Sequence, residues 1–479
     1  MSSQSVLVIG GGLAGLACAV ALAESGVKVR LLEKRPHLGG RATSYTLPDG
    51  SEVDNCQHVT LGCCTNLADF YRRAGADGKI RFYDRLYFAD RNGRRSTIAA
   101  SMLPPPLHMA PSFVGFGALG LGDKIGIAKA LMAIARAGGK PPDIDGLTML
   151  DWLHRMRQAS DAIERFWRVV LVSALDEELS RMDARYGIDV FWKAFLGSRG
   201  GYHVGIPSVP LAELYEGCCD AIVRKGGEVR LRCGAREIHV RENSFAGVTL
   251  EDGAEVSADA CVAAVPHDVL LGLLPAAMGE ERGPLAGLRH LRTSPITGVH
   301  LWFDRVVMKE PFLALLDNTT QWIFNKSLLY AHAQTNGDAP AAGQYLQLVI
   351  SASYDLVPRS RQDIIDLCRR ELEEVLPATR EAKLEKATVI KEIHATFSPE
   401  PGVDQWRPAQ KTAIEGLFLA GDWTRTGWPA TMEGAVRSGY LAAEETLASL
   451  GEPRKFVQAD MAFEGLSKVW AKRAQASLS

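Results

Sequence analysis

The sequence predicts an α/β protein in which a discontinuous dinucleotide-binding domain carries an inserted domain of mixed sheet and helices. Three observations support this fold class. A glycine-rich turn follows an apolar run at the N-terminus, a similar strand-to-helix pattern recurs near residue 420, and 479 residues are too many for one ordinary core. If both ends of the chain build one nucleotide-binding sheet, the segments between them must form the inserted domain.

The N-terminal segment SVLVIGGGLAGLACAVALAESGVKVRLLEKR predicts a strand, a glycine turn, a helix and a second strand. Within the G-x-G-x-x-G turn, Gly10 permits the tight turn, Gly12 lets the backbone approach a pyrophosphate, and Gly15 allows close helix–strand packing. Free N–H groups at the start of the helix attract phosphate. Glu33 closes the second strand and can accept hydrogen bonds from ribose hydroxyls. The pattern predicts dinucleotide binding; the alternative is a glycine-rich turn in an ordinary βαβ unit.

The segment KRPHLGGRATS, which follows the acid, favours FAD over NAD. Gly39, Gly40 and Arg41 resemble the second phosphate-contacting element of the glutathione-reductase-type FAD proteins. An arginine near a pyrophosphate is favoured by its charge and its paired donors. The predicted cofactor contacts in this region are Gly10, Gly12, Leu13, Ala14, Gly15, Glu33, Lys34, Gly39, Gly40, Arg41, Ala42 and Val59.

A second cofactor element is predicted in GLFLAGDWTRTGWPATMEGAVRSGYLAAEETLASLG, near the C-terminus. The apolar run Leu417–Ala420 predicts a strand, and Met432–Leu450 has helical periodicity. Asp422 at the strand end could accept from a ribityl hydroxyl, while the helix N-terminus could stabilise negative charge on a reduced flavin ring. Trp428 is either a core residue or a wall of the flavin site. The predicted contacts here are Gly421, Asp422, Trp428, Ala430, Thr431 and Met432. In the middle of the chain, the segment around Ala235 resembles a returning element of FAD domains, which implies that the backbone near Ala235 meets the adenine.

These three motifs together resemble the flavin amine oxidase and phytoene desaturase superfamily over nearly the whole chain. The resemblance implies a Rossmann-like FAD domain of the glutathione-reductase type, interrupted by a substrate domain. We predict helices over Leu211–Lys225 and Arg361–Leu376. The predicted domains are an FAD-binding domain of residues 1–99, 215–285 and 399–450, a substrate domain of residues 100–214 and 286–398, and an amphipathic tail of residues 451–479.

Composition excludes several classes of function. The formal net charge of −2 gives no electrostatic support to nucleic-acid binding. The nine cysteines include no C-x-x-C pair, so the usual zinc and thioredoxin-like patterns fail and a reducing, cytoplasmic compartment is expected. The N-terminus has no basic region of the kind that a signal peptide needs. The uncharged stretch Ser96–Gly122 is long enough to span a bilayer, but its prolines and glycines would break a spanning helix.

The segment VDNCQHVTLGCC gathers acid, amide, imidazole and thiol groups in a short space. Its spacing matches no usual metal-ligand set, so we expect no metal site. Cys63 and Cys64 are expected to be small buried hydrophobes. Asp54 and His58 are the candidate catalytic residues, as groups that transfer protons. The structural alternatives are that Asp54 ties down a loop and that His58 is a core histidine with satisfied hydrogen bonds.

A more specific resemblance is carried by VDNCQHVTLGCCTN, LPPPLHM, RTSPITGVHLWFD and the C-terminal flavin segment. Together they resemble the hydroxysqualene dehydroxylases, squalene-associated FAD enzymes, although that family usually has glycine at the position of Cys56 and an aromatic residue at Cys64. The resemblance implies that FADH2 and the C30 isoprenoid hydroxysqualene give squalene and water, in bacterial squalene and hopanoid biosynthesis. It also implies that His58 or Asp54 assists proton transfer. No second nucleotide fingerprint is visible, so the electron donor is either transiently bound NADPH or a separate reductase.

A C30 substrate predicts a long apolar tunnel. Ser96–Gly122 could line its mouth or dip into a bilayer, or could be plain core. In the tail, Phe463, Leu466 and Trp470 recur at helical spacing beside lysines, which suits an anionic membrane surface or docking on the protein itself. We favour peripheral association with the inner face of the cytoplasmic membrane.

Three other functions fit parts of the sequence. An FAD-dependent carotenoid or squalene desaturase would share the fold and cofactor and reverse the hydride flow. A flavin amine oxidase would place a lysine near the reactive flavin atom, and the sequence identifies no such lysine. A flavin-free isoprenoid-binding carrier would have no need of the intact set of Glu33, Gly40, Arg41, Gly421 and Asp422.

Overall fold

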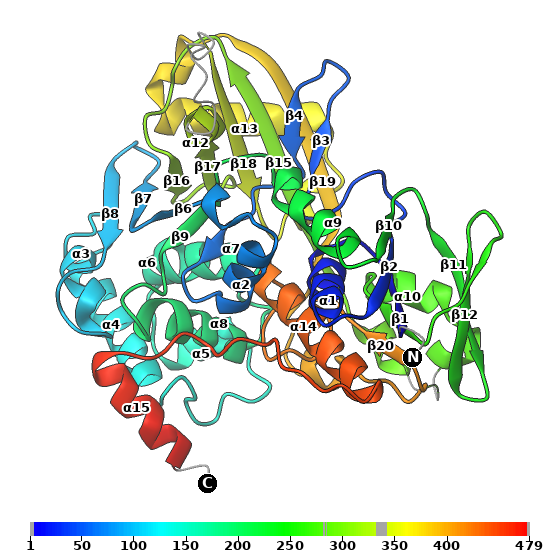
Figure 1. Cartoon of the computed structure of the whole chain (residues 1–479). Helices are drawn as coiled ribbons and strands as arrows, with labels where there is room; N and C mark the ends of the chain where they lie inside the picture. The colour runs from blue at the N-terminus through cyan, green and yellow to red at the C-terminus, as the bar shows by residue number, and fades with distance from the viewer. Residues whose placement is uncertain (1–3, 281–282, 284, 332–342, 477–479) are drawn as a thin grey trace.

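A five-stranded parallel sheet organises the half of the molecule that contains the N-terminus (Figure 1). The computed structural model describes residues 4–280, 283, 285–331 and 343–476. Residues from both ends and the middle of the chain pair in the sheet, which confirms the predicted discontinuous α/β fold. The strands, in spatial order, are β10 (Glu228–Arg230), β2 (Lys28–Leu32), β1 (Ser5–Ile9), β14 (Ala260–Ala263) and β20 (Leu417–Leu419).

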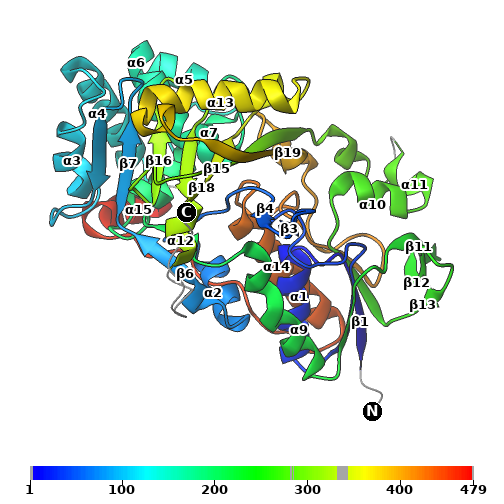
Figure 2. The same ribbon diagram turned by 90° about the horizontal axis from the view of Figure 1, so that it is seen from above.

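Helices α1 (Leu13–Glu24), α9 (Glu216–Val223) and α14 (Met432–Ser449) pack beside this sheet and against one another (Figure 2). A Cβ atom at Gly15 would lie 1.9 Å from the Gly10 carbonyl oxygen, so the glycine permits the helix–strand contact that its spacing predicts. The helix predicted over 211–225 divides into the 3-10 turn η5 (Leu211–Tyr215) and α9. A small antiparallel sheet lies at the outer edge, with β11 (Ala235–Arg241), β12 (Ser244–Leu250) and β13 (Glu255–Val256).

A seven-stranded mixed sheet forms the second half of the molecule. Helix α13 (Arg361–Val375), predicted one residue longer, covers one face of this sheet through Ile364, Cys368 and Leu372. The hairpin of residues 85–99 supplies the last two strands at one edge of this sheet. We therefore propose a domain boundary before Arg85, whereas the predicted boundary follows residue 99. The strands, in spatial order, are β19 (Leu384–Phe397), β15 (Thr293–Phe303), β18 (Gln344–Ile350), β17 (Trp322–Asn325), β16 (Phe312–Leu315), β7 (Arg85–Ala89) and β8 (Arg95–Ala99).

Helices from the region between the FAD-type segments gather on the other side of this sheet. Two of them contain π-helical stretches, η3 (Ile163–Arg168) and η4 (Phe191–Leu196), a geometry often found at functional sites. The α-helices here are α3 (Ala110–Val114), α4 (Leu121–Arg136), α5 (Met149–Arg155), α6 (Ser160–Ala162), α7 (Val169–Leu175) and α8 (Ala184–Val190).

The remaining elements connect the two halves. Residues 332–342 of the predicted substrate domain lie outside the described residues. The small strands are β3 (Ser44–Thr46), β4 (Glu52–Asp54), β5 (Thr60–Leu61), β6 (Ile80–Tyr83) and β9 (Val204–Pro207). The other helices are α2 (Thr65–Arg73), η1 (Asp77–Lys79), η2 (Leu107–Met109), α10 (His267–Leu273), α11 (Ala276–Gly279), η6 (Ala286–His290), α12 (Lys326–Ala331), η7 (Tyr354–Leu356), η8 (Pro377–Arg380) and η9 (Val403–Trp406).

The C-terminal tail crosses the molecule and ends in helix α15 (Gly465–Ala476) beside α4. Phe463 stacks on Trp192 with ring centroids 4.7 Å apart, so this residue of the predicted membrane face docks on the protein instead. Leu466 remains exposed, while Trp470 packs against the core. Residues 477–479 lie outside the described residues. Among the described helices, none is both long and apolar enough to cross a membrane.

We expect Gly439→Ala to weaken the packing of α14 on α1, because the new Cβ would lie 2.2 Å from the Ala14 carbonyl oxygen. Overpacking of this kind costs about 1–3 kcal/mol of unfolding free energy. The matched control is Gly272→Ala on exposed helix α10, where a Cβ meets no atom within 4 Å and helix propensity should add up to about 1 kcal/mol. Denaturant unfolding of both variants checks this, and equal stability of the two would contradict it.

Candidate active site

The glycine turn of the first βαβ unit and the GGR loop form one surface without side chains. Gly10 has φ +106°, a conformation that favours glycine. The Gly39 N–H donates to the Gly11 carbonyl at 2.8 Å, and a Cβ at Gly40 would come within 3.0 Å of the Gly12 Cα. Gly12 is the N-cap of α1 and supplies no side chain to its free N–H groups. This cradle suits a pyrophosphate at a helix N-terminus, as the two motifs predict.

The ribose and adenine end of the predicted site lies at the end of β2. The buried Glu33 carboxylate accepts from the Gly11 N–H at 2.6 Å and the Arg35 N–H at 2.7 Å, so a ribose hydroxyl would share it with these donors. The Cys233 N–H donates to the Glu33 carbonyl, which brings the strand that begins at Ala235 alongside this end. Lys34 instead reaches Glu251 at 2.8 Å and is exposed.

Arg41 and Asp422, both predicted as cofactor contacts, meet directly. One guanidinium nitrogen of Arg41 donates to the Asp422 carboxylate at 2.8 Å, and another donates to the Ala395 carbonyl on β19 at 2.5 Å. Asp422 follows β20 at the carboxyl edge of the parallel sheet, where ligands of such sheets bind. The GGR loop, the C-terminal motif and the mixed sheet therefore converge at one point.

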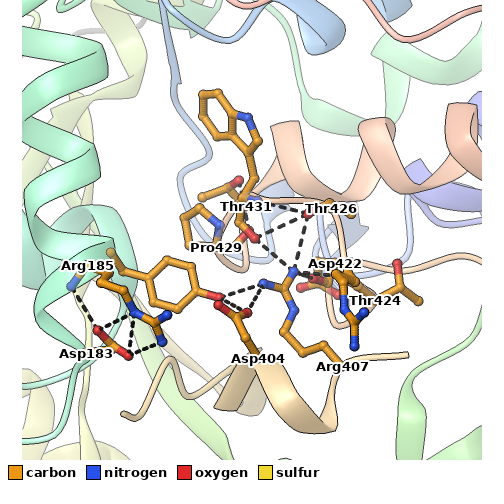
Figure 3. Close-up of polar contacts among 12 residues, drawn as sticks. Asp183, Arg185, Asp404, Arg407, Asp422, Thr424, Thr426, Pro429 and Thr431 are labelled. Atoms are coloured by element: carbon orange, nitrogen blue, oxygen red, sulfur yellow. Dashed lines mark hydrogen bonds and ion pairs between the residues drawn. The ribbon is translucent and has the colours of Figure 1, made fainter. Parts of the chain in front are cut away.

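The loop that carries Asp422 is held by a buried arginine that the sequence motifs do not include (Figure 3). Arg407 is 1% exposed. Its guanidinium donates to the backbone carbonyls of Asp422 at 3.0 Å, Thr424 at 2.6 Å and Trp428 at 2.8 Å. It also donates to the Asp404 carboxylate at 3.0 Å. Because the three backbone carbonyls lie along one irregular loop, the arginine fixes the shape of the predicted flavin-facing segment.

The end of this loop begins helix α14. The Thr431 hydroxyl accepts from the Gly434 N–H at 3.1 Å and so caps the helix. Ala430 and Trp428 are buried. Trp428, Thr431 and Met432 line an apolar cavity between this loop and helices α7 and α8. The predicted helix from Met432 is thus confirmed, with its N-terminus toward the cavity, where its dipole favours negative charge.

Asp54, a candidate proton donor, is a structural bridge in this geometry. It is 1% exposed, and its carboxylate accepts from Lys326 Nζ at 2.6 Å, Tyr330 at 2.7 Å, Ser44 at 2.8 Å and the Leu211 N–H at 3.1 Å. Burial opposes ionisation, but the Lys326 ammonium and the hydrogen bonds from Lys326, the Leu211 N–H and Tyr330 together lower the pKa of Asp54. A saturated, ionised carboxylate is poorly suited to give up a proton, so we no longer assign Asp54 as the acid.

His58 lies beside this bridge and stays a candidate. Its Nδ1 is 3.0 Å from the Cys56 carbonyl oxygen, a bond that makes Nδ1 the protonated nitrogen. Burial lowers the pKa of His58, which favours the neutral ring. Cys56 is buried with its thiol pKa raised to about 12, so it packs as a small hydrophobe. Its φ is not positive, so the chain needs no glycine at this position.

Two apolar cavities adjoin in the helical half of the molecule. The larger, about 1420 Å³ when its opening to solvent is included, is lined by Gln57, Val59 and Cys63 from the VDNCQHVTLGCC segment and by Trp428 from the C-terminal loop. The second, about 950 Å³ on the same measure, lies between α3, α4 and the π-helical stretches. The residues common to both linings are Leu86, Phe88, Val170 and Phe195. The two cavities therefore lie side by side, and together their linings extend from the Trp428–Met432 segment to the region of Ser96–Gly122.

Sequence reasoning did not find two lysines that the fold brings to this site. Lys326 is fully buried and also donates to the Gln57 side chain at 2.9 Å, while Lys193 lines the larger cavity. Neither lies in a recognisable motif, and Lys326 is 272 positions from the carboxylate it pairs with. Lys193 lies on a π-helical stretch, but the sequence pattern there does not differ from that of an ordinary helix. The sequence therefore gave no local signal for either lysine.

The fold and the cradle together define a flavoprotein oxidoreductase of the dinucleotide-binding class. A family model described as flavin containing amine oxidoreductase matches residues 13–447, so the chain belongs to that family and its cofactor is FAD.

Relatives and solved structures agree with this assignment. The chain is 29% identical to the 15-cis-phytoene desaturase of Solanum lycopersicum, over 92% of this chain and 77% of that protein. It is 26% identical to the zeta-carotene desaturase of Synechocystis, over 93% and 97% respectively. Among solved structures, an oxidoreductase from Methanosarcina mazei superposes with a TM-score of 0.71 at 17% identity, covering 91% of this chain and 99% of that one. Cyclohexylamine oxidase from Brevibacterium oxydans gives 0.68 at 17% identity, covering 94% and 100%.

We expect Lys326→Met to lower the unfolding free energy by about 3–5 kcal/mol, because it leaves the buried Asp54 carboxylate without its cation. Adding Asp54→Asn should restore part of this loss, so the two changes should combine to less than their sum. The control is Arg305→Met, which removes an exposed pair with Asp304 and should cost less than about 1 kcal/mol. Denaturant unfolding measures these three variants and the Asp54→Asn single variant, and strict additivity of the two single changes would contradict a direct pair.

Proposed function

We propose that this chain is an FAD-dependent reductase that removes the hydroxyl group of the C30 isoprenoid hydroxysqualene to give squalene, in bacterial squalene and hopanoid biosynthesis. The broader statement, an FAD-dependent oxidoreductase, rests on the family. The observation that carries the finer proposal is the apolar path of two adjoining cavities that ends at the predicted flavin-facing residues and contains a few polar side chains. Its size and lining suit one long, flexible hydrocarbon chain with a single polar group.

The polar lining of the larger cavity supports an alcohol as the substrate. Gln57, Asp189 and Lys193 lie among side chains that are otherwise largely apolar. These groups already have protein partners, since Lys193 pairs with Asp189 and Gln57 accepts from Lys326, but a hydroxyl group can add a hydrogen bond to the Lys193 ammonium that a hydrocarbon cannot make. The lining therefore favours a hydroxylated substrate over a carotene.

Reduced FAD supplies a hydride to the allylic carbon, and the balance is one alcohol and one FADH2 giving one alkene chain, one water and one FAD. The chain's own contribution is to hold the hydrocarbon, exclude water and deliver the proton that turns the departing hydroxyl into water. His58 is retained as a proposed proton-transfer residue, acting from the edge of the cavity next to Gln57 and Val59. The electron donor is proposed to be NADPH or a separate reductase.

Desaturation is the second candidate, and the comparisons favour it. The curated relatives reported above are named phytoene and zeta-carotene desaturases, which act on isoprenoid chains and would use the same apolar path. Fold and cofactor do not set the direction of hydride flow. The residues lining the reacting end of the cavity, rather than the fold, must decide between the two reactions.

We also propose that the mouth of the path lies on a membrane surface on the cytoplasmic side. Met102, Val114 and Leu121 are exposed by 86%, 70% and 76%. The second cavity is lined by neighbouring residues of α3 and α4. The Leu466 N–H donates to the Pro105 carbonyl, which places the exposed side of α15 beside the same mouth. A lipid substrate could enter there without crossing water.

An anaerobic single turnover tests the proposed reaction. With bound FAD reduced and hydroxysqualene added, we expect flavin reoxidation matched one to one by squalene, identified by mass. Squalene alone should leave the reduced flavin unchanged. Absence of reoxidation, together with bleaching of the oxidised enzyme by phytoene or squalene, would replace the proposal with desaturation.

Vesicle flotation tests the membrane surface. Replacing Met102 and Leu121 by Gln should lower binding to anionic phospholipid vesicles at least about ten-fold, because two exposed apolar side chains are lost from the contact. Val223→Gln on α9 is the matched control, since Val223 is 56% exposed but lies in the FAD-binding half. Equal binding by all three proteins would contradict the assigned surface.

A further inference from the structure

The larger cavity has one charged pair on its wall, next to the predicted flavin-facing loop. Lys193 and Asp189 both line the cavity, and their ion pair measures 3.0 Å. Lys193 is on the π-helical stretch η4 and Asp189 on α8, one helical turn earlier. The Lys193 side chain is 21% exposed, so most of it is withdrawn from bulk water. An ion pair between residues four positions apart is common on solvated helix faces. This ion pair differs because it lies on the wall of a cavity.

Trp428 supplies an independent observation at the same place. Lys193 Nζ lies 4.9 Å from the centre of the Trp428 indole ring. The indole Nε1–H is buried and has no hydrogen-bond partner within the part of the chain that the structure describes. A buried donor without a partner is uncommon and calls for an explanation, such as a bound acceptor. Both Lys193 and Trp428 line the same cavity, so its wall carries an ammonium next to an indole whose N–H has no partner.

The backbone around both groups is rigid enough to make a built site. Trp428 is fixed through its carbonyl by the buried Arg407 and follows directly after Gly427 in the loop. Lys193 is held by its ion pair with Asp189. Such support holds donors in place before a ligand binds, which is what a subsite for a single hydroxyl group requires.

We propose that Lys193 and Trp428 form the hydroxyl subsite of this cavity, with Lys193 as the acid that protonates the departing oxygen. This inference rests on the proposed function and assigns its proton donor to Lys193, which lines the cavity, rather than to His58, which does not. In the step, the carbon–oxygen bond breaks, the oxygen takes a proton from Lys193 Nζ and leaves as water, and the carbon receives the hydride from reduced flavin. The proton that flavin oxidation releases to solvent restores the Lys193 ammonium. Asp189 is a positioning residue that holds the ammonium beside the indole.

The competing role for Lys193 is purely structural, as a cation that closes the wall of the cavity. A structural lysine would not distinguish an alcohol from a hydrocarbon of the same length. Binding of two ligands therefore separates the roles without relying on turnover. Hydroxysqualene and squalene differ by the hydroxyl group, and each can be titrated into the oxidised holoenzyme while flavin absorbance and tryptophan fluorescence are followed.

The test compares Lys193→Met, Lys193→Arg and Trp428→Phe with the control Lys225→Met, an exposed lysine after α9 that lines neither cavity. We expect wild type and the control to bind hydroxysqualene about ten-fold or more tighter than squalene, as for a charge-assisted hydrogen bond. Lys193→Met should lose most of this preference, with squalene affinity unchanged. Its single-turnover rate should fall by about 10²–10⁴-fold, the usual contribution of a general acid. Trp428→Phe should lose several-fold of the preference and keep squalene binding.

The outcomes separate this inference from the proposed function. If wild type converts hydroxysqualene but Lys193→Met keeps both the preference and the rate, the subsite is wrong and the dehydroxylase stands. If wild type neither prefers hydroxysqualene over squalene nor converts it, both the subsite and the proposed function are wrong. Flavin content and thermal midpoint establish that each variant folds. Should Lys193→Met lose FAD, Lys193→Arg, which keeps the cation, must retain the alcohol preference, and its failure to do so overturns the subsite.

Discussion

The buried pair between Asp54 and Lys326 is the constraint on which the arrangement of the site depends. It joins the strand that follows the GGR loop to helix α12 of the mixed sheet, and the same carboxylate receives the backbone of Leu211, where the chain returns to the FAD-binding half. Its net contribution to stability is modest once the desolvation of both charges is counted. Its consequence for geometry is larger, because an unpaired charge at this depth is so costly that the two halves have one favoured alignment.

That alignment determines what surrounds the cavity. One wall comes from the residues after Asp54, another from the loop held by Arg407, and a third from α7, α8 and the π-helical stretch η4. The first two belong to the cofactor-binding half and the third to the helical region. Chemistry at a bound flavin and recognition of the chain to be reduced or oxidised therefore take place on surfaces that come from different parts of the fold and meet at this junction.

The family assignment and the cavity lining answer different questions. Membership in the flavin-containing amine oxidoreductases establishes the cofactor and the class of chemistry. Members of one fold carry out different reactions by changing a few residues around a common cofactor. Here the relatives named as desaturases share the frame, while the charged and hydrogen-bonding groups near Trp428 support a substrate with a polar group. The residues that line the cavity, rather than the fold, therefore determine which reaction takes place.

The parts that the sequence by itself determined are those encoded by local spacing. The glycine turn, Glu33, the GGR loop and the strand before Asp422 depend on backbone conformations that a few adjacent residues dictate, so the fold class and the predicted helix from Met432 could be obtained from the sequence. Asp54 was recognised as unusual, but its role depends on a lysine hundreds of residues away. Arg407, Lys326 and Lys193 lie in no motif, because their partners are set by packing between distant segments. Only the tertiary structure could decide which buried charges meet, since pairing at long range leaves no periodic trace in the chain.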